Sequence, residues 1–278
     1  MNQLDLILKK NWDILIILDA CRFDYFNKFA QKYFDEKPRK VVSPASNTLE
    51  WAKKVLEPRK WPDVVYVSAN PFINSKRAVK GLDLRNNFYF IYDAWLYDWN
   101  EDYKTVMPDD LTKRALQLIE QYKDKKFIIH YIQPHAPYLE PKIGSSFFIL
   151  GGNKVKPLIP FEKVRKLLSK IVMYYTPLPI LQLYFKFENR RGANITNIEL
   201  AFAKLGVEGL RKVYENNLHF ALKAVRKLLN NIEDRRVVIT ADHGELLADR
   251  FLFGRKLGHP PYHHYPELIE VPWLEVII

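Results

Sequence analysis

Cysteine is almost absent from this chain of 278 residues, in which Cys21 is the single example. One cysteine can form neither an internal disulfide nor a cysteine-rich zinc site. Glycine is also scarce, with 10 residues, whereas 48% of the residues are hydrophobic and 27% are charged. This balance excludes a disordered or fibrous chain and is sufficient for a large core.

Long apolar runs are missing as well. No uninterrupted apolar stretch approaches the roughly 18–20 residues that a membrane-spanning helix needs. The N-terminal segment MNQLDLILKKNWDILIILDACRFD has only a short apolar run with acidic side chains on both sides, which is unlike a secretory signal peptide. From these two absences we expect a soluble cytoplasmic protein.

Acidic residues are outnumbered, because 43 Lys and Arg against 32 Asp and Glu give a net charge of +11. The segment 151–191 has nine basic and two acidic residues, so 9 − 2 = +7 of this charge lies there. Such a segment is either a solvated basic face or a guide for an anionic substrate, an anionic lipid surface or nucleic acid. No nucleic-acid-binding motif is recognisable in the sequence.

Strand-like apolar segments alternate with helix-like amphipathic segments along the chain. The expected strands are 12–18, 41–42, 63–70, 87–95, 126–132, 235–241 and 271–278. The expected helices are 22–34, 49–56, 109–122 and 210–232. This alternation predicts an α/β fold in which helices sandwich a mainly parallel sheet. Residues 1–278 then form a single domain, with residues 140–205 as a basic, aromatic-rich and mostly helical insertion.

Polar, potentially reactive side chains follow several of the expected strands. They are Asp19, Ser46, Thr48, His135, Asp242 and His243. Ligands of parallel sheets bind outside the carboxyl ends of the strands, so we expect these side chains to meet at one edge of the sheet.

This set of side chains suits a metal-dependent group transfer. Aspartate and histidine together bind a divalent ion such as Mn²⁺, Zn²⁺, Mg²⁺ or Ca²⁺. A hydroxyl beside such an ion becomes a nucleophile near neutral pH, and further histidines neutralise an oxyanion or protonate a leaving group. The residues therefore indicate transfer of a phosphoryl or sulfuryl group.

Five segments resemble motifs of the sulfatase-like branch of the alkaline phosphatase superfamily, in the order found in that branch. They are ILIILDACRFDYF, SNTLEW, HYIQPHAPY, TADHGE and GHPPYHHYPELIEVPWLEV. The resemblance implies one catalytic domain over residues 1–278, with a metal site made of Asp19, Thr48, Asp242 and His243. It also implies that Thr48 attacks the substrate, and that the substrate is contacted by His135 and His259.

Departures from the family motifs limit which members of the branch this chain resembles. SNTLEW lacks the Cys/Ser-x-Pro-x-Arg motif from which sulfatases make their nucleophile, so we do not expect a formylglycine sulfatase. Ala20 replaces a second acidic residue beside Asp19, and PHAPY provides His135 where two-metal members provide both Asp and His. We therefore expect one tightly held metal ion.

Structural interpretations stay open for several of these residues. Thr48 also fits an ordinary helix N-cap, with Ser46 as the alternative nucleophile. Arg22 either orients the neighbouring metal ligand or pairs with a nearby acid, and His263 is either an exposed loop residue or a substrate contact. We interpret His130, inside an expected strand, as a core histidine whose hydrogen bonds are satisfied.

The sequence thus predicts a metal-dependent hydrolase or transferase of phosphate monoesters or diesters. One alternative is a sulfate-ester or phosphonate hydrolase of the same fold. The other is a non-catalytic basic protein that binds nucleic acid or an anionic membrane. Within either class, residues 140–205 either form a lid over the site or dock on an anionic lipid surface through residues 151–191.

Overall fold

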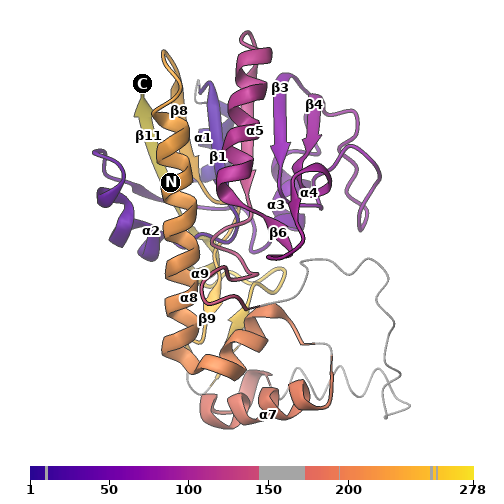
Figure 1. The fold of residues 1–278 in the computed structure, drawn as a ribbon, viewed down its shortest axis with the longest axis vertical. Coiled ribbons are helices and arrows are strands. Elements are labelled where there is room, and N and C mark those ends of the chain that lie inside the picture. Colours follow the sequence, from indigo (N-terminus) through magenta and orange to yellow (C-terminus); the bar gives the residue numbers. More distant parts are fainter. Residues whose placement is uncertain (10–11, 144–172, 194, 251–252, 255) are drawn as a thin grey trace.

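A seven-stranded sheet forms the centre of the computed structural model, which describes residues 1–9, 12–143, 173–193, 195–250, 253–254 and 256–278 (Figure 1). The strand order is β2-β11-β8-β1-β7-β3-β4. The strands are β1 (Ile14–Leu18), β2 (Arg39–Val42), β3 (Trp61–Ser68), β4 (Phe88–Asp93), β7 (Lys126–Tyr131), β8 (Arg236–Thr240) and β11 (Glu270–Ile277). Neighbouring strands are parallel except for β11, which is antiparallel to both β8 and β2. The predicted mainly parallel α/β fold is confirmed.

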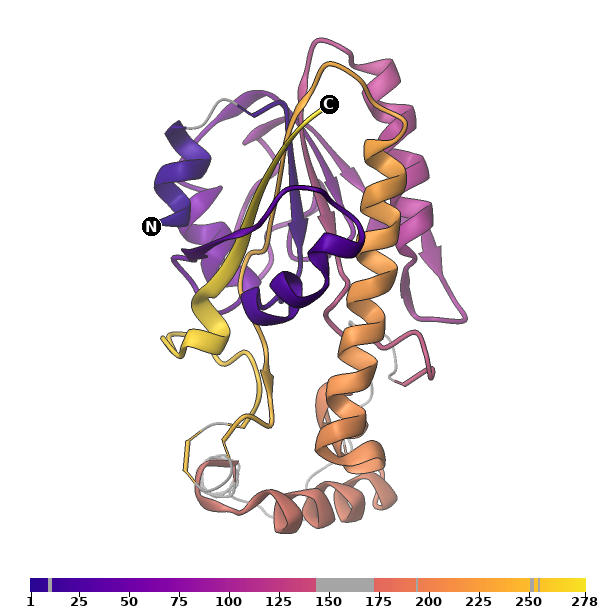
Figure 2. The ribbon, with the colours of Figure 1, turned by 90° about the vertical axis from the view of Figure 1, so that its left-hand side faces the viewer.

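Helices cover both faces of the sheet (Figure 2). One face carries α1 (Gln3–Lys9) and α3 (Thr48–Val55), which are joined by a hydrogen bond from the Trp51 indole to the Gln3 side chain. The other face carries α5 (Pro108–Gln121) and the long α8 (Asn197–Leu229). Because β1 lies between these two layers, all five of its residues are buried, which explains the unbroken run ILIIL.

Two helices differ from the sequence prediction. Helix α1 was not expected at all, and α8 begins at Asn197 rather than at residue 210. Gly206 interrupts α8 with φ 72°, a left-handed conformation that glycine adopts without steric cost, so the helix kinks there. The remaining elements are α2 (Phe23–Phe29), η1 (Ala30–Lys32), α4 (Ala94–Tyr97), β5 (Trp99–Asn100), β6 (Thr105–Val106), α7 (Leu178–Arg190), β9 (Leu246–Leu247), β10 (Leu257–Gly258) and α9 (Pro266–Ile269).

A second hydrophobic cluster lies outside the sheet core, where α7 packs against the first part of α8. It includes Leu181, Phe185 and Phe202 from the described part of the expected insertion 140–205, and Tyr214 from the part of α8 that follows it. Residues 144–172 of that insertion lie outside the described residues. In the part of the chain that the structure describes, no helix is long and apolar enough to span a bilayer.

The parallel strands point toward the end of the molecule that carries α7 (Figure 1). Their carboxyl ends, and the loops that follow them, therefore lie between the sheet core and the second hydrophobic cluster. This is the edge at which the sequence predicts a ligand site.

Candidate metal centre and active site

Two aspartates and a histidine meet in a fully buried cluster at this edge. Asp19 follows β1, and Asp242 and His243 follow β8, the parallel neighbour of β1. The His243 Nε2 atom lies 3.6 Å from Asp19 Oδ1 and 3.4 Å from Asp242 Oδ2. Adjacent strands of parallel direction bring together side chains that are more than two hundred residues apart in sequence.

The electrostatics of this cluster fit a cation. Asp242 Oδ1 accepts hydrogen bonds from the backbone N–H groups of Ala20 and His243, at 3.1 and 2.9 Å. Its Oδ2 atom is buried and has no hydrogen-bond partner among the described residues. Burial, together with the negative charge of Asp242, raises the pKa of Asp19 to about 8. Burial also lowers the pKa of His243 well below its ordinary value, so its imidazole is neutral.

One ligand atom from each of these three residues lies within 4.8 Å of the others. Two carboxylates without a compensating cation are costly in a buried place, whereas carboxylate oxygens and a neutral imidazole nitrogen are good ligands for a divalent ion. The chemistry of Asp19, Asp242 and His243 therefore fits a divalent ion, and their role as its ligands stays a prediction.

Thr48 contributes a hydroxyl to the same cluster. Its Oγ1 atom lies 3.2 Å from His243 Nε2 and is nearly inaccessible to solvent. Helix α3 is capped by the preceding residue instead, because the Asn47 side chain accepts a hydrogen bond from the backbone N–H of Glu50 at 3.0 Å. The Thr48 hydroxyl is therefore not used as the N-cap and faces the acidic cluster.

Asn70 also belongs to this cluster, although the sequence analysis did not select it. It follows β3, and its Nδ2 atom donates to Asp19 Oδ2 at 2.6 Å and lies 3.5 Å from Thr48 Oγ1. No signal in the sequence pointed to it, because Asn70 closes the segment 63–70 that is predicted as a strand, whereas β3 ends at Ser68.

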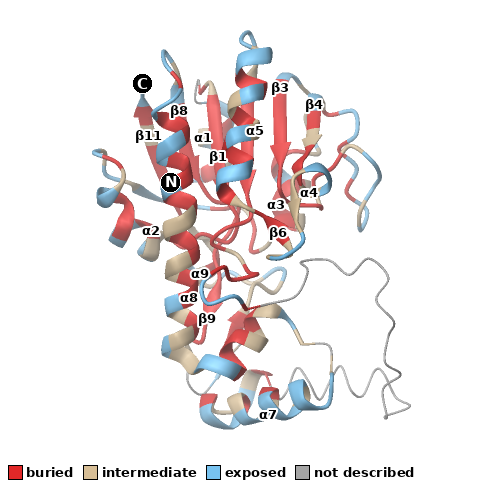
Figure 3. Ribbon diagram, viewed as in Figure 1, coloured by how far each residue is buried: buried red, intermediate tan, exposed pale blue. Residues whose placement is uncertain are grey.

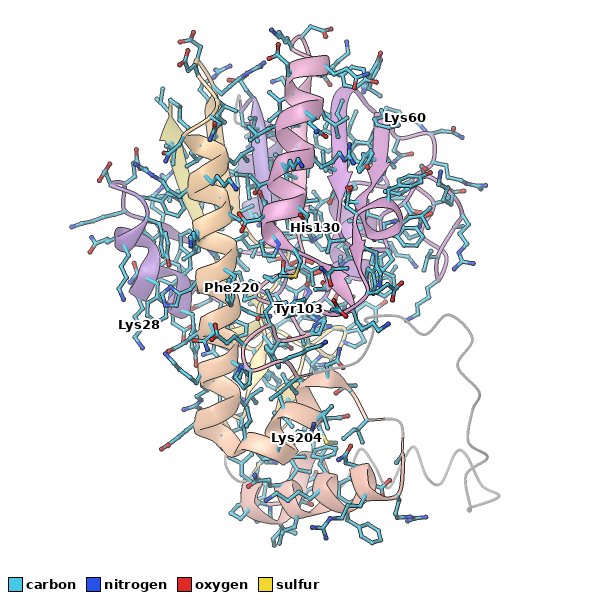
Figure 4. All side chains as sticks on the ribbon, in the orientation of Figure 1. Lys28, Lys60, Tyr103, His130, Lys204 and Phe220 are labelled. Carbon is cyan, nitrogen blue, oxygen red and sulfur yellow. The ribbon has the colours of Figure 1, made fainter. Side chains whose placement is uncertain are left out.

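His130 is buried in β7, as expected, but only one of its ring nitrogens is satisfied. Nδ1 hydrogen-bonds to the Tyr66 hydroxyl at 2.8 Å. Nε2 has no hydrogen-bond partner among the described residues and faces Asp19 Oδ2 at 3.6 Å and Asp242 Oδ2 at 4.0 Å. Burial lowers the pKa of His130 to about 4. The prediction that His130 is a core histidine with satisfied hydrogen bonds is thus wrong for its Nε2 atom. Figure 4 shows His130 at the end of the sheet that faces α7.

A second group of ionisable residues lies next to the first and consists of His135, Glu245 and His259. The His259 ring lies 5.1 Å from the ring of His135 and 4.6 Å from that of His243, measured between centroids. Its Nδ1 atom lies 2.9 Å from Glu245 Oε1. Burial disfavours the imidazolium, but the Glu245 carboxylate outweighs this effect and raises the pKa of His259 to about 9. Both histidines expected to contact substrate are therefore adjacent to the expected metal ligands.

Gly244 separates the two groups for a steric reason. Its backbone N–H donates to the Leu268 carbonyl at 2.7 Å, and a Cβ atom on residue 244 would lie 2.1 Å from the carbonyl oxygen of Glu267. Only glycine permits this close approach. The tight packing fixes a loop in which His243 belongs to one group and Glu245 to the other.

Ser46 lies outside both groups. Its hydroxyl donates to the Pro260 carbonyl at 2.8 Å and accepts from the backbone N–H of His263 at 3.3 Å. The Glu50 carboxylate accepts from the backbone N–H of Tyr262 at 3.3 Å. These bonds attach the loop after His259 to the turn that carries Thr48, which is a structural role for Ser46.

The His263 Nε2 atom lies 3.1 Å from the Tyr174 hydroxyl, which also lies 3.3 Å from the Tyr265 hydroxyl. Arg22 forms a buried ion-pair network instead of contacting Asp19. Its guanidinium lies 2.7 Å from Asp24 and 2.8 Å from Asp249, and it donates to the Glu245 carbonyl at 3.2 Å.

A mainly parallel sheet with clustered aspartates and histidines at its carboxyl edge and a hydroxyl beside them is the arrangement expected of the alkaline phosphatase superfamily. The model of the Sulfatase family matches residues 72–274, and the chain belongs to this family. A search of curated proteins finds no sequence match.

Solved structures of related fold include phosphoethanolamine transferases and sulfatases. Lipooligosaccharide phosphoethanolamine transferase A (EptA) of Neisseria meningitidis, an integral membrane protein, superimposes with a TM-score of 0.52 at 13% identity over 96% of this chain. The TM-score is 0.54 for the C-terminal periplasmic domain of EcEptC from Escherichia coli in complex with Zn. That match has 11% identity and covers 99% of this chain and 74% of that domain. BT1596, a 2-O GAG sulfatase, gives 0.52 at 10% identity, over 95% of this chain and 64% of its own.

The chain spans 48% of the length of the EptA protein. Several of the similar structures are periplasmic domains, among them that of EcEptC and that of EptC from Campylobacter jejuni. This finding contradicts the cytoplasmic location expected from the sequence. That expectation was wrong because it rested only on finding no leader pattern and no spanning run in this sequence, and such a finding does not identify a compartment.

Proposed function

We propose that the chain is a metal-dependent hydrolase or transferase of phosphate esters, with Thr48 as its nucleophile. One observation carries the proposal. The Thr48 hydroxyl, freed from helix capping by Asn47, lies 3.2 Å from His243 Nε2 beside two buried aspartates. An ordinary buried threonine has no reason to lie beside two carboxylates and a neutral imidazole.

Asp19, Asp242, His243 and Thr48 would hold one divalent ion, for which the ligand set suits Mn²⁺, Zn²⁺, Mg²⁺ or Ca²⁺. Such an ion, when bound, lowers the pKa of a hydroxyl and offsets the charge of a phosphoryl group. Asn70 supports the site by holding Asp19 in place through its 2.6 Å hydrogen bond and by lying 3.5 Å from the attacking oxygen.

The reaction proposed for Thr48 is an in-line displacement at phosphorus. The Thr48 hydroxyl loses its proton to solvent, and its Oγ1 forms a bond to phosphorus while the bond from phosphorus to the ester oxygen breaks, which leaves a phosphothreonine. The departing oxygen takes a proton from His259, whose raised pKa keeps it protonated near neutral pH. The N-terminus of α3, where Thr48 stands first, carries a partial positive charge that favours an anionic group at this position. His135 and His259, whose ring centroids lie 5.1 Å apart, would donate hydrogen bonds to the phosphoryl oxygens and to the departing ester oxygen.

A second displacement would release the phosphoryl group from Thr48. If water attacks, the protein is a hydrolase, and if an alcohol attacks, it is a transferase. A sulfate ester or a phosphonate is the second candidate substrate, and membership of the Sulfatase family favours it. The non-catalytic alternative is disfavoured because the metal-ligand candidates, the hydroxyl and the substrate-contact histidines lie together.

Thr48→Ala tests the proposal, with turnover measured on a panel of phosphate monoesters, phosphate diesters, phosphonates and sulfates. We expect turnover to fall by roughly 10⁴–10⁶-fold, as when a covalent nucleophile is deleted, with an unchanged circular dichroism spectrum. Thr48→Ser should retain part of the activity, because it keeps the attacking oxygen. Mass spectrometry of wild-type protein quenched during turnover should find the phosphate on Thr48.

Ser46→Ala is the matched control, since it removes a neighbouring buried hydroxyl that faces the Pro260 carbonyl. Near-normal turnover in Thr48→Ala, with loss in Ser46→Ala, would assign the nucleophile to Ser46. Near-normal turnover in both variants would refute a covalent mechanism.

A further inference from the structure

Helix α7 has two apolar faces, and only one of them is used in the core. Leu178, Leu181 and Phe185 are buried in the second hydrophobic cluster against α8. Successive residues of an α-helix are turned by about 100°, so this spacing places the three side chains on one side of the helix. The contact explains how α7 is attached to the protein but not why its other side is apolar.

The opposite side of α7 exposes large apolar side chains to solvent. Ile180 is 57% exposed, Leu183 64% and Phe187 56%. Their spacing of three and four residues places them in one stripe, opposite the side that packs on α8. Single exposed apolar residues need no explanation, whereas an aligned stripe on a surface helix indicates an interaction site.

Basic residues accompany the stripe. Lys186 and Arg190 are exposed and lie along one flank of it, and Arg191 follows at the end of the helix. The Arg191 guanidinium lies 5.3 Å from the centre of the Phe187 ring. Glu188 is the one acidic residue of this helix, so the charge of the helix and its end is positive, as is the charge of the whole chain, +11.

The position of α7 suits a docking surface. The helix forms the end of the molecule beyond the carboxyl edge of the sheet, and its outward side is exposed (Figures 1 and 3). Tyr175, which precedes the helix, is 61% exposed and pairs edge-to-face with Phe253, itself 69% exposed. Exposed aromatic rings thus continue the apolar surface next to α7.

We propose that the α7 face, defined as Ile180, Leu183, Lys186, Phe187 and Arg190, docks on the surface of a bilayer that contains anionic lipids. An apolar stripe flanked by Lys and Arg is the pattern of a helix that lies in a membrane interface, with its apolar side chains inserted and its cations at the headgroups. The inference does not depend on the reaction at Thr48.

Charge decides between this occupant and others. A second copy of the chain would bring two positively charged helices together, which like-charge repulsion disfavours. Nucleic acid would attract Lys186 and Arg190 but would leave Ile180 and Leu183 without a partner. A bilayer with anionic headgroups satisfies both the cations and the apolar stripe.

Co-sedimentation of the whole chain with vesicles tests the proposal. One set of vesicles contains phosphatidylcholine with phosphatidylglycerol, and the other contains phosphatidylcholine alone. Ile180→Gln with Leu183→Gln should weaken binding to the anionic vesicles at least tenfold. The matched control is Leu96→Gln with Ile277→Gln, which changes one Leu and one Ile that are also exposed but lie far from α7. This control should bind like the wild type.

A second pair of variants tests the charge. Lys186→Gln with Arg190→Gln should weaken binding about tenfold or more, because each cation near an anionic surface contributes favourably. Lys223→Gln with Arg226→Gln, on the exposed side of α8, is the matched control and should leave binding unchanged. Binding of the wild type should also decrease in high salt.

Several outcomes would overturn the proposal. The wild type could fail to sediment with anionic vesicles, or the Ile180/Leu183 variant could bind as strongly as the wild type. If the protein formed a dimer in solution and the Ile180/Leu183 variant abolished that dimer, the face would be assigned to a second copy of the chain. If the wild type bound duplex DNA but not vesicles, and the Lys186/Arg190 variant abolished the DNA binding, the face would be assigned to nucleic acid. Thr48→Ala should bind vesicles normally, so failure of this proposal and failure of the proposed reaction are distinguishable.

Discussion

Arg22 should be among the most sensitive positions for stability, although it lies outside the proposed chemistry. Its guanidinium is 7% exposed and pairs with Asp249, whose side chain is 15% exposed, at 2.8 Å. Replacing Arg22 by methionine keeps the length of the side chain but leaves the Asp249 carboxylate without its main cation in a largely buried place. Removing one partner of such a pair costs about 3–5 kcal/mol. Because Asp249 is not completely buried, we expect Arg22→Met to lower the free energy of unfolding by about 3 kcal/mol.

Urea unfolding, followed by tryptophan fluorescence in the presence of a chelator, measures this loss without a contribution from bound metal. Arg22→Met with Asp249→Asn should be more stable than the sum of the two single changes implies, because the double variant no longer buries an unpaired charge. Arg85→Met is the control, since Arg85 pairs with Asp83 at 2.6 Å but both side chains are 44–48% exposed. We expect a much smaller loss of stability there, because solvent screens an exposed pair. Equal losses in Arg22→Met and Arg85→Met would refute the argument that burial makes the Arg22 network important.

Two further predictions concern the site itself. Asp242→Asn keeps the Oδ1 atom that accepts hydrogen bonds from the backbone N–H groups of Ala20 and His243, so the fold should persist. The metal content, measured by mass spectrometry, should fall together with activity. An unchanged metal content would exclude Asp242 as a ligand. Asn70→Ala removes the amide that holds Asp19 and lies beside Thr48. We expect kcat to fall by roughly 10–100-fold, and an unchanged kcat would leave Asn70 with a structural role only.

The sheet could be predicted from the sequence because its central strands are covered on both faces. Burial on both sides demands continuous apolar runs, and such runs are easy to recognise in β1 and β8. Helix α1 was missed because QLDLILK is too short to establish a helical period. The first part of α8 lies in the insertion 140–205 that the sequence predicts as mostly helical, but its continuity with the helix expected at 210–232 was not predicted; the two segments join at a kink at Gly206.

The first metal-ligand group could be predicted for a related reason. Asp19 directly follows β1, Asp242 and His243 come two and three residues after the end of β8, and the parallel arrangement of β1 and β8 places the ends of these strands next to each other. Position along the chain was therefore enough to bring them together. Their roles as ligands stay a prediction, as do those of Thr48, His135 and His259.

The partnership of Glu245 with His259 could not be predicted, because it depends on the register of a small hairpin. Strands β9 and β10 pair antiparallel, with Leu246 opposite Gly258 and Leu247 opposite Leu257. In an antiparallel ladder the next pair outward joins residue 245 to residue 259, and their side chains meet at 2.9 Å. A slip of one residue would turn His259 to the other face of the hairpin. The raised pKa of His259 thus depends on main-chain pairing in a two-residue ladder, which hydrophobic periodicity in so short a segment does not reveal.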